Sequence, residues 1–207
     1  DQVFEHFAPF DLATVDETLP PGQVVRDGRE LRVGAFEGYG ADALRAAAAA
    51  AARSIRRDGG RVAWAARDAD EVRALVEGSA YGAYDAGIRK HGYGSAPGVT
   101  LVLDADEGLR GLAERQAVVT RRIGFARDLV NMPPNELTPP ALAGRARGLD
   151  LPHVTAETFG RAEIEARGMG AFAAVGAGSP REPQLIVLRY DPPSPARGTP
   201  VRRRSPR

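Results

Sequence analysis

The chain has 207 residues, of which 43% are hydrophobic and 27% charged, a composition typical of a soluble globular protein. Its formal net charge of +1 argues against a general nucleic-acid-binding protein, which usually carries a concentrated basic excess. Cysteine is absent, which excludes disulfides, thiolate metal ligands and a cysteine nucleophile and fits a cytoplasmic location. No apolar run approaches the about 18 residues that a membrane-spanning helix needs.

After a turn at Leu19–Gly22, the first half alternates patterns typical of strands with patterns typical of helices. Asp42 is a candidate N-cap for a long alanine-rich helix that ends at about Arg57. A second helix contains Gly78 and Gly82, which weaken it. The expected elements are a strand over 30–36, the alanine-rich helix, a strand over 61–66, the second helix over 69–87 and a strand over 98–104. This order predicts an α/β unit with a mainly parallel sheet.

The second half begins with a long helix pattern from about Gly108 to Val130, and the prolines of "NMPPN" prevent its continuation. A short helix follows, with Thr138 as its N-cap and Pro139 at its first position, where a missing N–H costs nothing. The remaining expected elements are a strand over 153–159, a helix over 161–168 with Gly168 as its left-handed C-cap, and two apolar strands over 171–179 and 184–190.

The last stretch, "DPPSPARGTPVRRRSPR", is rich in proline and arginine and has scarcely an apolar residue. Because it cannot bury apolar surface, we expect a loosely held, solvated tail. Nucleic-acid binding by this tail is the less favoured alternative, since its arginines are not accompanied by aromatic residues.

Motifs that suggest chemistry have simpler structural interpretations. "VGAGS" (Val175–Ser179) is not a dinucleotide-binding fingerprint, because Arg181 stands where the third glycine is needed, so we expect a glycine turn between two strands. The three histidines lie far apart without the spacing of metal ligands, and a surface loop is favoured over a pocket for the second; they are His6, His91 and His153.

Clustered carboxylates fall at helix starts and turns, where they favour the helix dipole; they are Asp68, Asp70, Glu71, Asp104, Asp106 and Glu107. Ser79 lies in "VEGSAYG", which is not a nucleophile elbow. We therefore predict no catalytic residue and no metal ligand in this chain, and the residues that bind substrate are not identified.

Two segments nevertheless strongly resemble the leucyl aminopeptidase (cytosol aminopeptidase) family: "RDLVNMPPNELTPPALAGRA" from Arg127 and "RGMGAFAAVGAGSPREPQLIVLRYDP" from Arg167. The first half resembles the N-terminal domain of that family more loosely. The resemblance implies an α/β chain with four parts: a macro-like N-terminal domain with a mainly parallel sheet over residues 1–110, a linking helix over 111–131, the start of an incomplete aminopeptidase-type catalytic domain over 132–192, and the tail over 193–207.

The resemblance also implies a cytoplasmic metalloprotease that releases N-terminal amino acids, leucine among them, from peptides by two-metal hydrolysis. Two manganese or zinc ions are expected in a complete family member, which generally forms homo-hexamers. The metal ligands of the family begin in "GKG.TFDSGG", which this sequence does not contain, and its site uses two lysines, whereas Lys90 is the only lysine here. We therefore expect this chain to end before the ligands, to bind no metal ion and to be inactive alone. The alternative is a non-catalytic module that binds a nucleotide or assembles with a partner through the macro-like half.

Overall fold

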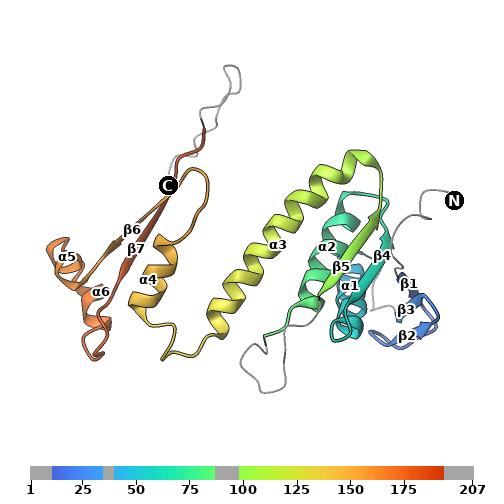
Figure 1. The fold of residues 1–207 in the computed structure, drawn as a ribbon, viewed down its shortest axis with the longest axis horizontal. Helices are drawn as coiled ribbons and strands as arrows, with labels where there is room; N and C mark the ends of the chain where they lie inside the picture. Colours follow the sequence, from blue (N-terminus) through green and yellow to red (C-terminus); the bar gives the residue numbers. More distant parts are fainter. Residues whose placement is uncertain (1–10, 35–39, 87–97, 194–207) are drawn as a thin grey trace. The chain divides into compact units, whose positions relative to one another are not determined.

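The computed structural model describes residues 11–34, 40–86 and 98–193, which form two compact units of mixed helix and strand (Figure 1). Unit 1 comprises Asp1–Asn131 and unit 2 comprises Met132–Arg207. The predicted α/β class is confirmed. Four predicted features lie outside the described residues: the histidines at positions 6 and 91, the end of the first strand beyond residue 34, and the tail from residue 194.

Unit 1 is built on a five-stranded sheet with the strand order β2-β3-β1-β4-β5. β2 runs antiparallel to β3, and the other three neighbouring pairs are parallel, which confirms the predicted mainly parallel sheet. The strands are β1 (Asp11–Asp16), β2 (Val24–Asp27), β3 (Glu30–Gly34), β4 (Gly60–Ala65) and β5 (Val99–Asp104).

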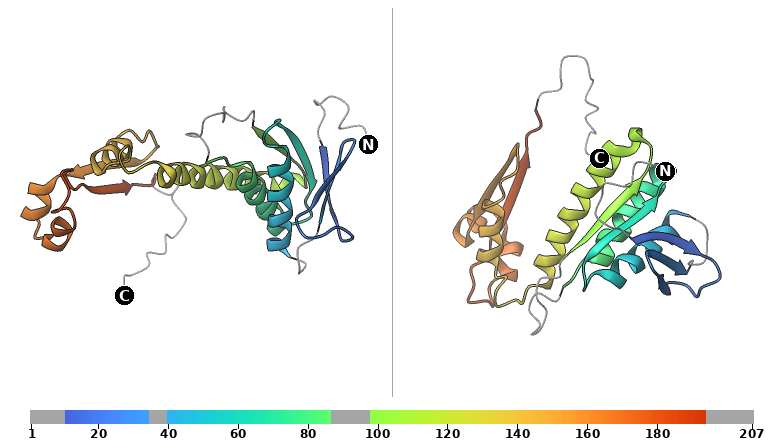
Figure 2. Two further views of the ribbon diagram at one scale, coloured as in Figure 1. Left: turned by 90° about the horizontal axis from the view of Figure 1, so that it is seen from below. Right: turned by 45° about the vertical axis from the view of Figure 1, so that its right-hand side comes forward.

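Helices of unit 1 connect successive parallel strands. α1 (Ala41–Ile55) joins β3 to β4, and α2 (Ala69–Ala83) joins β4 to β5. The two views of Figure 2 show both helices on the same side of the sheet. Their buried side chains form one hydrophobic cluster with the sheet residues Leu31, Val33, Val62 and Trp64. Burial of this apolar surface is the main source of stability in unit 1.

β1 was not predicted, although it lies between β3 and β4 and pairs with both. Its sequence, "DLATVD", buries the small residue Ala13 and the charged residue Asp11 while Leu12 is half exposed, so its burial does not follow its hydrophobicity. Arg26 of β2 donates to both carboxylate oxygens of Asp11, at 3.0 and 2.8 Å. This partner compensates the cost of burying the Asp11 carboxylate.

The acidic cluster lies at the start of α2, as predicted, whereas the predicted N-cap of α1 is wrong. The Asp68 carboxylate accepts hydrogen bonds from the backbone N–H groups of Asp70 and Glu71, both at 2.9 Å, and so caps α2. The N-cap of α1 is Gly40, so the prediction of Asp42 is wrong. Asp42 already belongs to the helix and pairs with Arg45, whereas a capping residue needs non-helical backbone angles.

Gly78 and Gly82 allow α1 and α2 to approach closely, so the prediction that they weaken the second helix misses their role. A Cβ atom at Gly78 would lie 2.1 Å from the Arg45 carbonyl oxygen, and one at Gly82 would lie 2.1 Å from the Ala49 carbonyl oxygen. Only glycine leaves room for a backbone this close. The Ala48 side chain of α1 belongs to the same contact, because its Cβ atom would lie 2.9 Å from a Cβ at Gly78.

After the 3₁₀ turn η1 (Glu107–Leu109), α3 (Arg110–Asn131) packs against α2. Glu77 of α2 accepts hydrogen bonds from Arg45 of α1 at 2.6 Å and from Gln116 of α3 at 2.8 Å, so one carboxylate links the three helices. In α3 itself only Thr120 is buried. None of the helices in the described ranges has the length and apolar character needed to cross a membrane.

Unit 2 pairs β6 (Val154–Phe159) and β7 (Leu185–Tyr190) in an antiparallel two-stranded sheet, against which α4 (Pro139–Arg147) packs. Two short helices, α5 (Arg161–Ala166) and α6 (Gly170–Val175), lie between the strands in sequence. Two predicted local features are confirmed in this unit. The Thr138 hydroxyl accepts a hydrogen bond from the Ala141 N–H at 3.4 Å, and Gly168, which follows α5, adopts a left-handed φ of 70°.

The prediction of a strand over 171–179 is wrong, because this segment begins with helix α6 and ends in a turn. An apolar run of this length is compatible with a strand or a buried helix, and its alanines favour a helix. Arg161 also stabilises the end of α6, because its guanidinium donates to the carbonyl oxygens of Ala173 at 3.4 Å and Gly176 at 3.1 Å. The "VGAGS" turn therefore connects a helix to β7.

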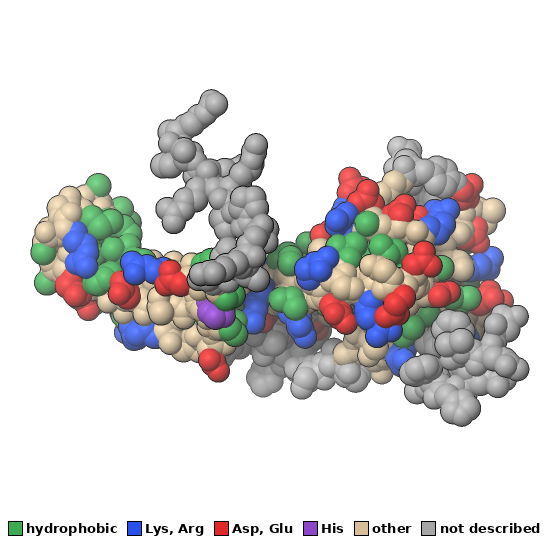
Figure 3. All heavy atoms as spheres, turned by 90° about the horizontal axis from the view of Figure 1, so that it is seen from above, with side chains coloured by type: hydrophobic (Ala, Val, Ile, Leu, Met, Phe, Trp, Pro, Cys, Tyr) green, Lys and Arg blue, Asp and Glu red, His purple; other side chains and the backbone are tan. Residues whose placement is uncertain are grey.

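Within the described residues, β6 and β7 pair only with each other, so each has an unpaired edge. Several large apolar side chains of the unit are exposed, including Val175 (90%), Leu188 (54%) and Tyr190 (62%). Figure 3 shows apolar side chains at the end of unit 2 formed by α5 and α6. Unpaired edges and exposed apolar surface promote association.

We expect Gly82→Ala to lower the free energy of unfolding by about 2 kcal/mol or more, because the new methyl group overlaps the α1 backbone. The matched control is Gly124→Ala in α3, where a Cβ would meet nothing within 4 Å. That substitution should raise the free energy of unfolding by about 0.5–1 kcal/mol through helix propensity. Urea denaturation followed by circular dichroism measures both, and equal effects would contradict the close helix contact.

Candidate functional site

The segment that carries the family resemblance forms a helix end, a closed turn and a new helix start. α3 ends at Asn131, and Pro133 and Pro134 follow. The Pro133 carbonyl oxygen accepts hydrogen bonds from the N–H groups of Glu136 and Leu137, both at 2.9 Å. The N-cap of α4 comes next, so the predicted helix stop, loop and helix are confirmed.

A polar cluster surrounds Tyr84, the C-cap residue of α2, beside the last turn of α3. The Tyr84 hydroxyl donates to the Asp128 carboxylate and accepts from the Asn131 side-chain amide, both at 3.0 Å. The Arg127 guanidinium carbon lies 3.8 Å from the centre of the Tyr84 ring, a cation–π contact. Arg56, the C-cap residue of α1, donates to the Tyr84 carbonyl oxygen at 2.9 Å.

Electrostatics in this cluster favour the neutral phenol. Burial raises the pKa of Tyr84 above its usual value, the hydrogen bond from Asn131 lowers it, and the hydrogen bond to Asp128 raises it. The groups of the cluster are engaged with one another through these contacts. The arrangement therefore stabilises a helix end, and it offers neither a nucleophile nor a general base.

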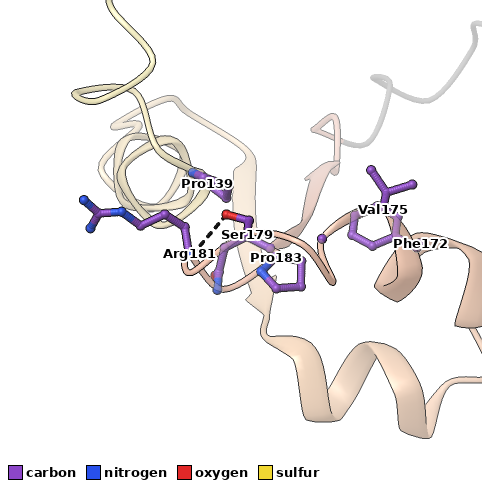
Figure 4. Close-up of a pocket in the computed structure, with 8 residues that line it drawn as sticks. Pro139, Phe172, Val175, Ser179, Arg181 and Pro183 are labelled. Atoms are coloured by element: carbon purple, nitrogen blue, oxygen red, sulfur yellow. Dashed lines mark hydrogen bonds between the residues drawn. The ribbon is translucent and has the colours of Figure 1, made fainter.

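Unit 2 contains an apolar hollow of about 470 Å³ (Figure 4). Phe172 and Val175 of α6 form one wall, Pro139 of α4 contributes, and the turn before β7 completes it. The Arg181 N–H donates to the Ser179 hydroxyl at 3.0 Å and closes this turn. The described residues that line it are Pro139, Phe172, Val175, Gly176, Ser179, Arg181, Pro183 and Gln184. None of these residues carries a carboxylate or an imidazole, so they offer no metal ligand of that kind.

Carboxylates in the described residues serve as caps and ion-pair partners. Glu71 accepts from the Arg67 guanidinium, Asp70 pairs with Arg73, and Glu107 pairs with Arg110. The hydrogen bond from Arg67 holds the pKa of Glu71 below its usual value. In unit 2, Glu163 accepts from the Gly160 N–H at 2.9 Å and Glu182 from the Arg161 N–H at 3.0 Å, so each caps the start of α5.

In these ranges no group of three or more His, Asp or Glu side chains could hold a metal ion. His153 occupies the turn before β6 with a left-handed φ of 63°. Ser79 is buried in α2, and its hydroxyl has no hydrogen-bond partner among the described residues. The residues that the structure describes thus do not fit the two-metal centre that the resemblance implies. That the chain contains no catalytic residue and no metal ligand stays a prediction.

Comparison with known proteins supports the interpretation of the sequence. Residues 124–201 match the catalytic domain of the cytosol aminopeptidase family. A probable cytosol aminopeptidase of Roseiflexus castenholzii is 41% identical over 129 residues, which are 56% of this chain and 26% of the relative. A probable cytosol aminopeptidase of Streptomyces avermitilis is 33% identical over 164 residues, 73% of this chain and 32% of the relative.

Solved structures resemble the chain over most of its length. The bottromycin maturation enzyme BotP has a TM-score of 0.74 and 29% identity over 90% of this chain and 47% of BotP, and it has also been solved in complex with Mn. A mutant of tomato leucine aminopeptidase has a TM-score of 0.71 and 20% identity over 86% of this chain and 40% of its own, and so shares the fold. The fold is thus of the aminopeptidase type.

The chain belongs to the leucyl aminopeptidase (cytosol aminopeptidase) family, as its motifs predict. It spans 26% and 32% of the lengths of the two curated relatives described above. The Tyr84 cluster was not found from the sequence, because its hydrogen bonds join residues 44 and 47 positions apart. The aromatic residue near the end of the second predicted helix was the only local signal.

Replacing Tyr84 by phenylalanine should remove a late step from the alkaline titration of the protein. Because the pKa of Tyr84 is raised, its contribution to stability is present below the pKa of a free tyrosine, about 10, and is lost as the pH rises through the folded-state pKa. Absorbance at 295 nm follows ionisation of the five tyrosines. The denatured chain is the control, and a late step that persists in Tyr84→Phe would contradict the assignment.

Proposed function

We propose that this chain is the N-terminal part of a metal-dependent aminopeptidase that releases N-terminal amino acids from peptides. The observation that carries the proposal is the match of residues 124–201 to the catalytic domain of the family, joined to a fold shared with BotP over 90% of the chain. In the complete protein we propose two divalent metal ions, manganese or zinc, a cytoplasmic location and assembly into a homo-oligomer of the hexameric type.

We propose that the described residues form a structural scaffold in the complete protein. Unit 1 supplies a sheet, its helices and an ordered end of α3, and unit 2 supplies the capped turn, α4 and the apolar hollow beside β7. The described carboxylates and histidine do not form the two-metal centre, so no step of the reaction is assigned to them. In complete members the ligands would begin in "GKG.TFDSGG", a segment that this sequence does not contain.

The 207-residue chain should therefore show no metal-dependent hydrolysis of leucine p-nitroanilide. The assay measures release of p-nitroaniline at 405 nm with manganese or zinc added. A complete family member, treated in the same way, is the positive control. Clear metal-dependent turnover by the purified chain would contradict the assignment of the metal ligands to residues that it lacks.

Manganese binding tests the same proposal without relying on activity. Titration of the chain with MnCl₂, followed by isothermal calorimetry or by the electron paramagnetic resonance signal of free Mn²⁺, should show no saturable site at micromolar concentration, since no suitable group of ligands lies in the described residues. The complete family member should bind under identical conditions. A stoichiometric site in the chain would require ligands that the described residues do not provide.

A further inference from the structure

Tyr84 connects two parts of the chain that the family comparison separates. The catalytic-domain match starts at residue 124, inside α3, so Tyr84 lies 40 residues before the match begins. Its three partners from α3, Arg127, Asp128 and Asn131, all lie within the match. The contact therefore runs from the N-terminal part of the chain to the first residues of the part that corresponds to the catalytic domain.

Among the residues that the structure describes, no side chain in the last turn of α3 is fully buried. Thr120 is the one buried residue described in this helix, and it lies about three turns before Asn131. Val130 in the last turn is 84% exposed. The last turn contains no basic residue that could interact favourably with the helix dipole. Helix ends without apolar packing fray, because their last carbonyl groups lack partners within the helix.

Backbone hydrogen bonds fix the position of Tyr84, so that it can stabilise the end of α3. Its backbone nitrogen donates to the Ala80 carbonyl oxygen at 3.1 Å, and its own carbonyl oxygen accepts from Arg56. The close contact of α1 with α2 fixes the helix from which it projects. The Arg127 guanidinium lies over the Tyr84 ring, and the Tyr84 hydroxyl is hydrogen-bonded to both Asp128 and Asn131.

We propose that Tyr84 is a positioning residue that keeps the last turn of α3 helical as far as Asn131, so that the catalytic-domain segment leaves unit 1 from an ordered helix end. The N-terminal part is then required for the local structure of the first residues of the catalytic-domain match. This role does not depend on the proposed aminopeptidase activity, because it concerns contacts within unit 1 and can be measured without substrate or metal.

The test is amide hydrogen exchange by NMR in the full chain carrying Tyr84→Phe. This variant keeps the ring that Arg127 contacts and removes only the hydroxyl. Losing the two hydrogen bonds should make the amides of residues 128–131 exchange roughly five-fold faster, while amides near Thr120 keep their rates. The side-chain amide signal of Asn131 should shift as well, which general loss of stability would not cause.

The matched control is Tyr81→Phe, a half-buried tyrosine one turn earlier on the same helix. It should leave the exchange of residues 128–131 and the Asn131 signal unchanged. Asn131→Ala, at an exposed position, provides a second variant that does not disturb the core. The double variant Tyr84→Phe with Asn131→Ala should exchange no faster than Tyr84→Phe alone, because the two groups share one hydrogen bond.

Three outcomes would overturn the proposal. The first is unchanged exchange of residues 128–131 in Tyr84→Phe. The second is an equal acceleration in Tyr81→Phe, and the third is a uniform acceleration along all of α3, which would indicate global destabilisation. Activity assays do not enter the test, so a chain without aminopeptidase activity would leave its result intact.

Discussion

The close approach of α1 to α2 is the constraint on which the rest of unit 1 depends. Gly78 and Gly82 remove the side chains that would separate the helices, and the α1 backbone at Arg45 and Ala49 occupies the space that a Cβ atom would take. With these two helices fixed over one face of the sheet, the larger apolar side chains of the strands are covered. α3 then packs on α2, and Glu77 joins all three helices through two hydrogen bonds. Because Tyr84 ends α2, the same packing places its ring and hydroxyl beside the last turn of α3.

Polar residues in this chain are used mainly for structure. Carboxylates that might have suggested chemistry cap helices or pair with arginines, as Asp68 and Glu71 show. Helix caps, turns and the hydrogen bonds from Arg161 to the end of α6 stabilise unit 2. Among its described residues, Ile164 is a large aliphatic side chain that is fully buried. Its strands have unpaired edges and several of its apolar side chains are exposed, so packing against further structure would stabilise it. These properties agree with a scaffold whose family relatives are much longer.

Local sequence patterns predicted much of the fold. The predictions failed where contacts between residues distant in sequence determine the structure. Prolines, the Thr138 cap and the left-handed Gly168 act within a few residues, so their effects were predictable. The strand β1 was missed because its pairing with β3 and β4, and the ion pair of Asp11 with Arg26, compensate a pattern with little apolar alternation. The run at 171–179 suited a strand or a helix, and contacts from Arg161 favour the helix. In the candidate site, the helix stop and loop were predicted, whereas the Tyr84 cluster was not.

The sequence by itself determined the family, the α/β class and the position of the helix stop before "PPN", because motifs, periodicity and proline geometry are local properties of the chain. It also contains no "GKG.TFDSGG" segment, which is a property of composition and order alone. Only the tertiary structure decided that Gly78 and Gly82 serve helix packing, and that Tyr84 meets Asp128 and Asn131. These contacts join segments more than 30 residues apart, and they form only when folding brings the three helices together.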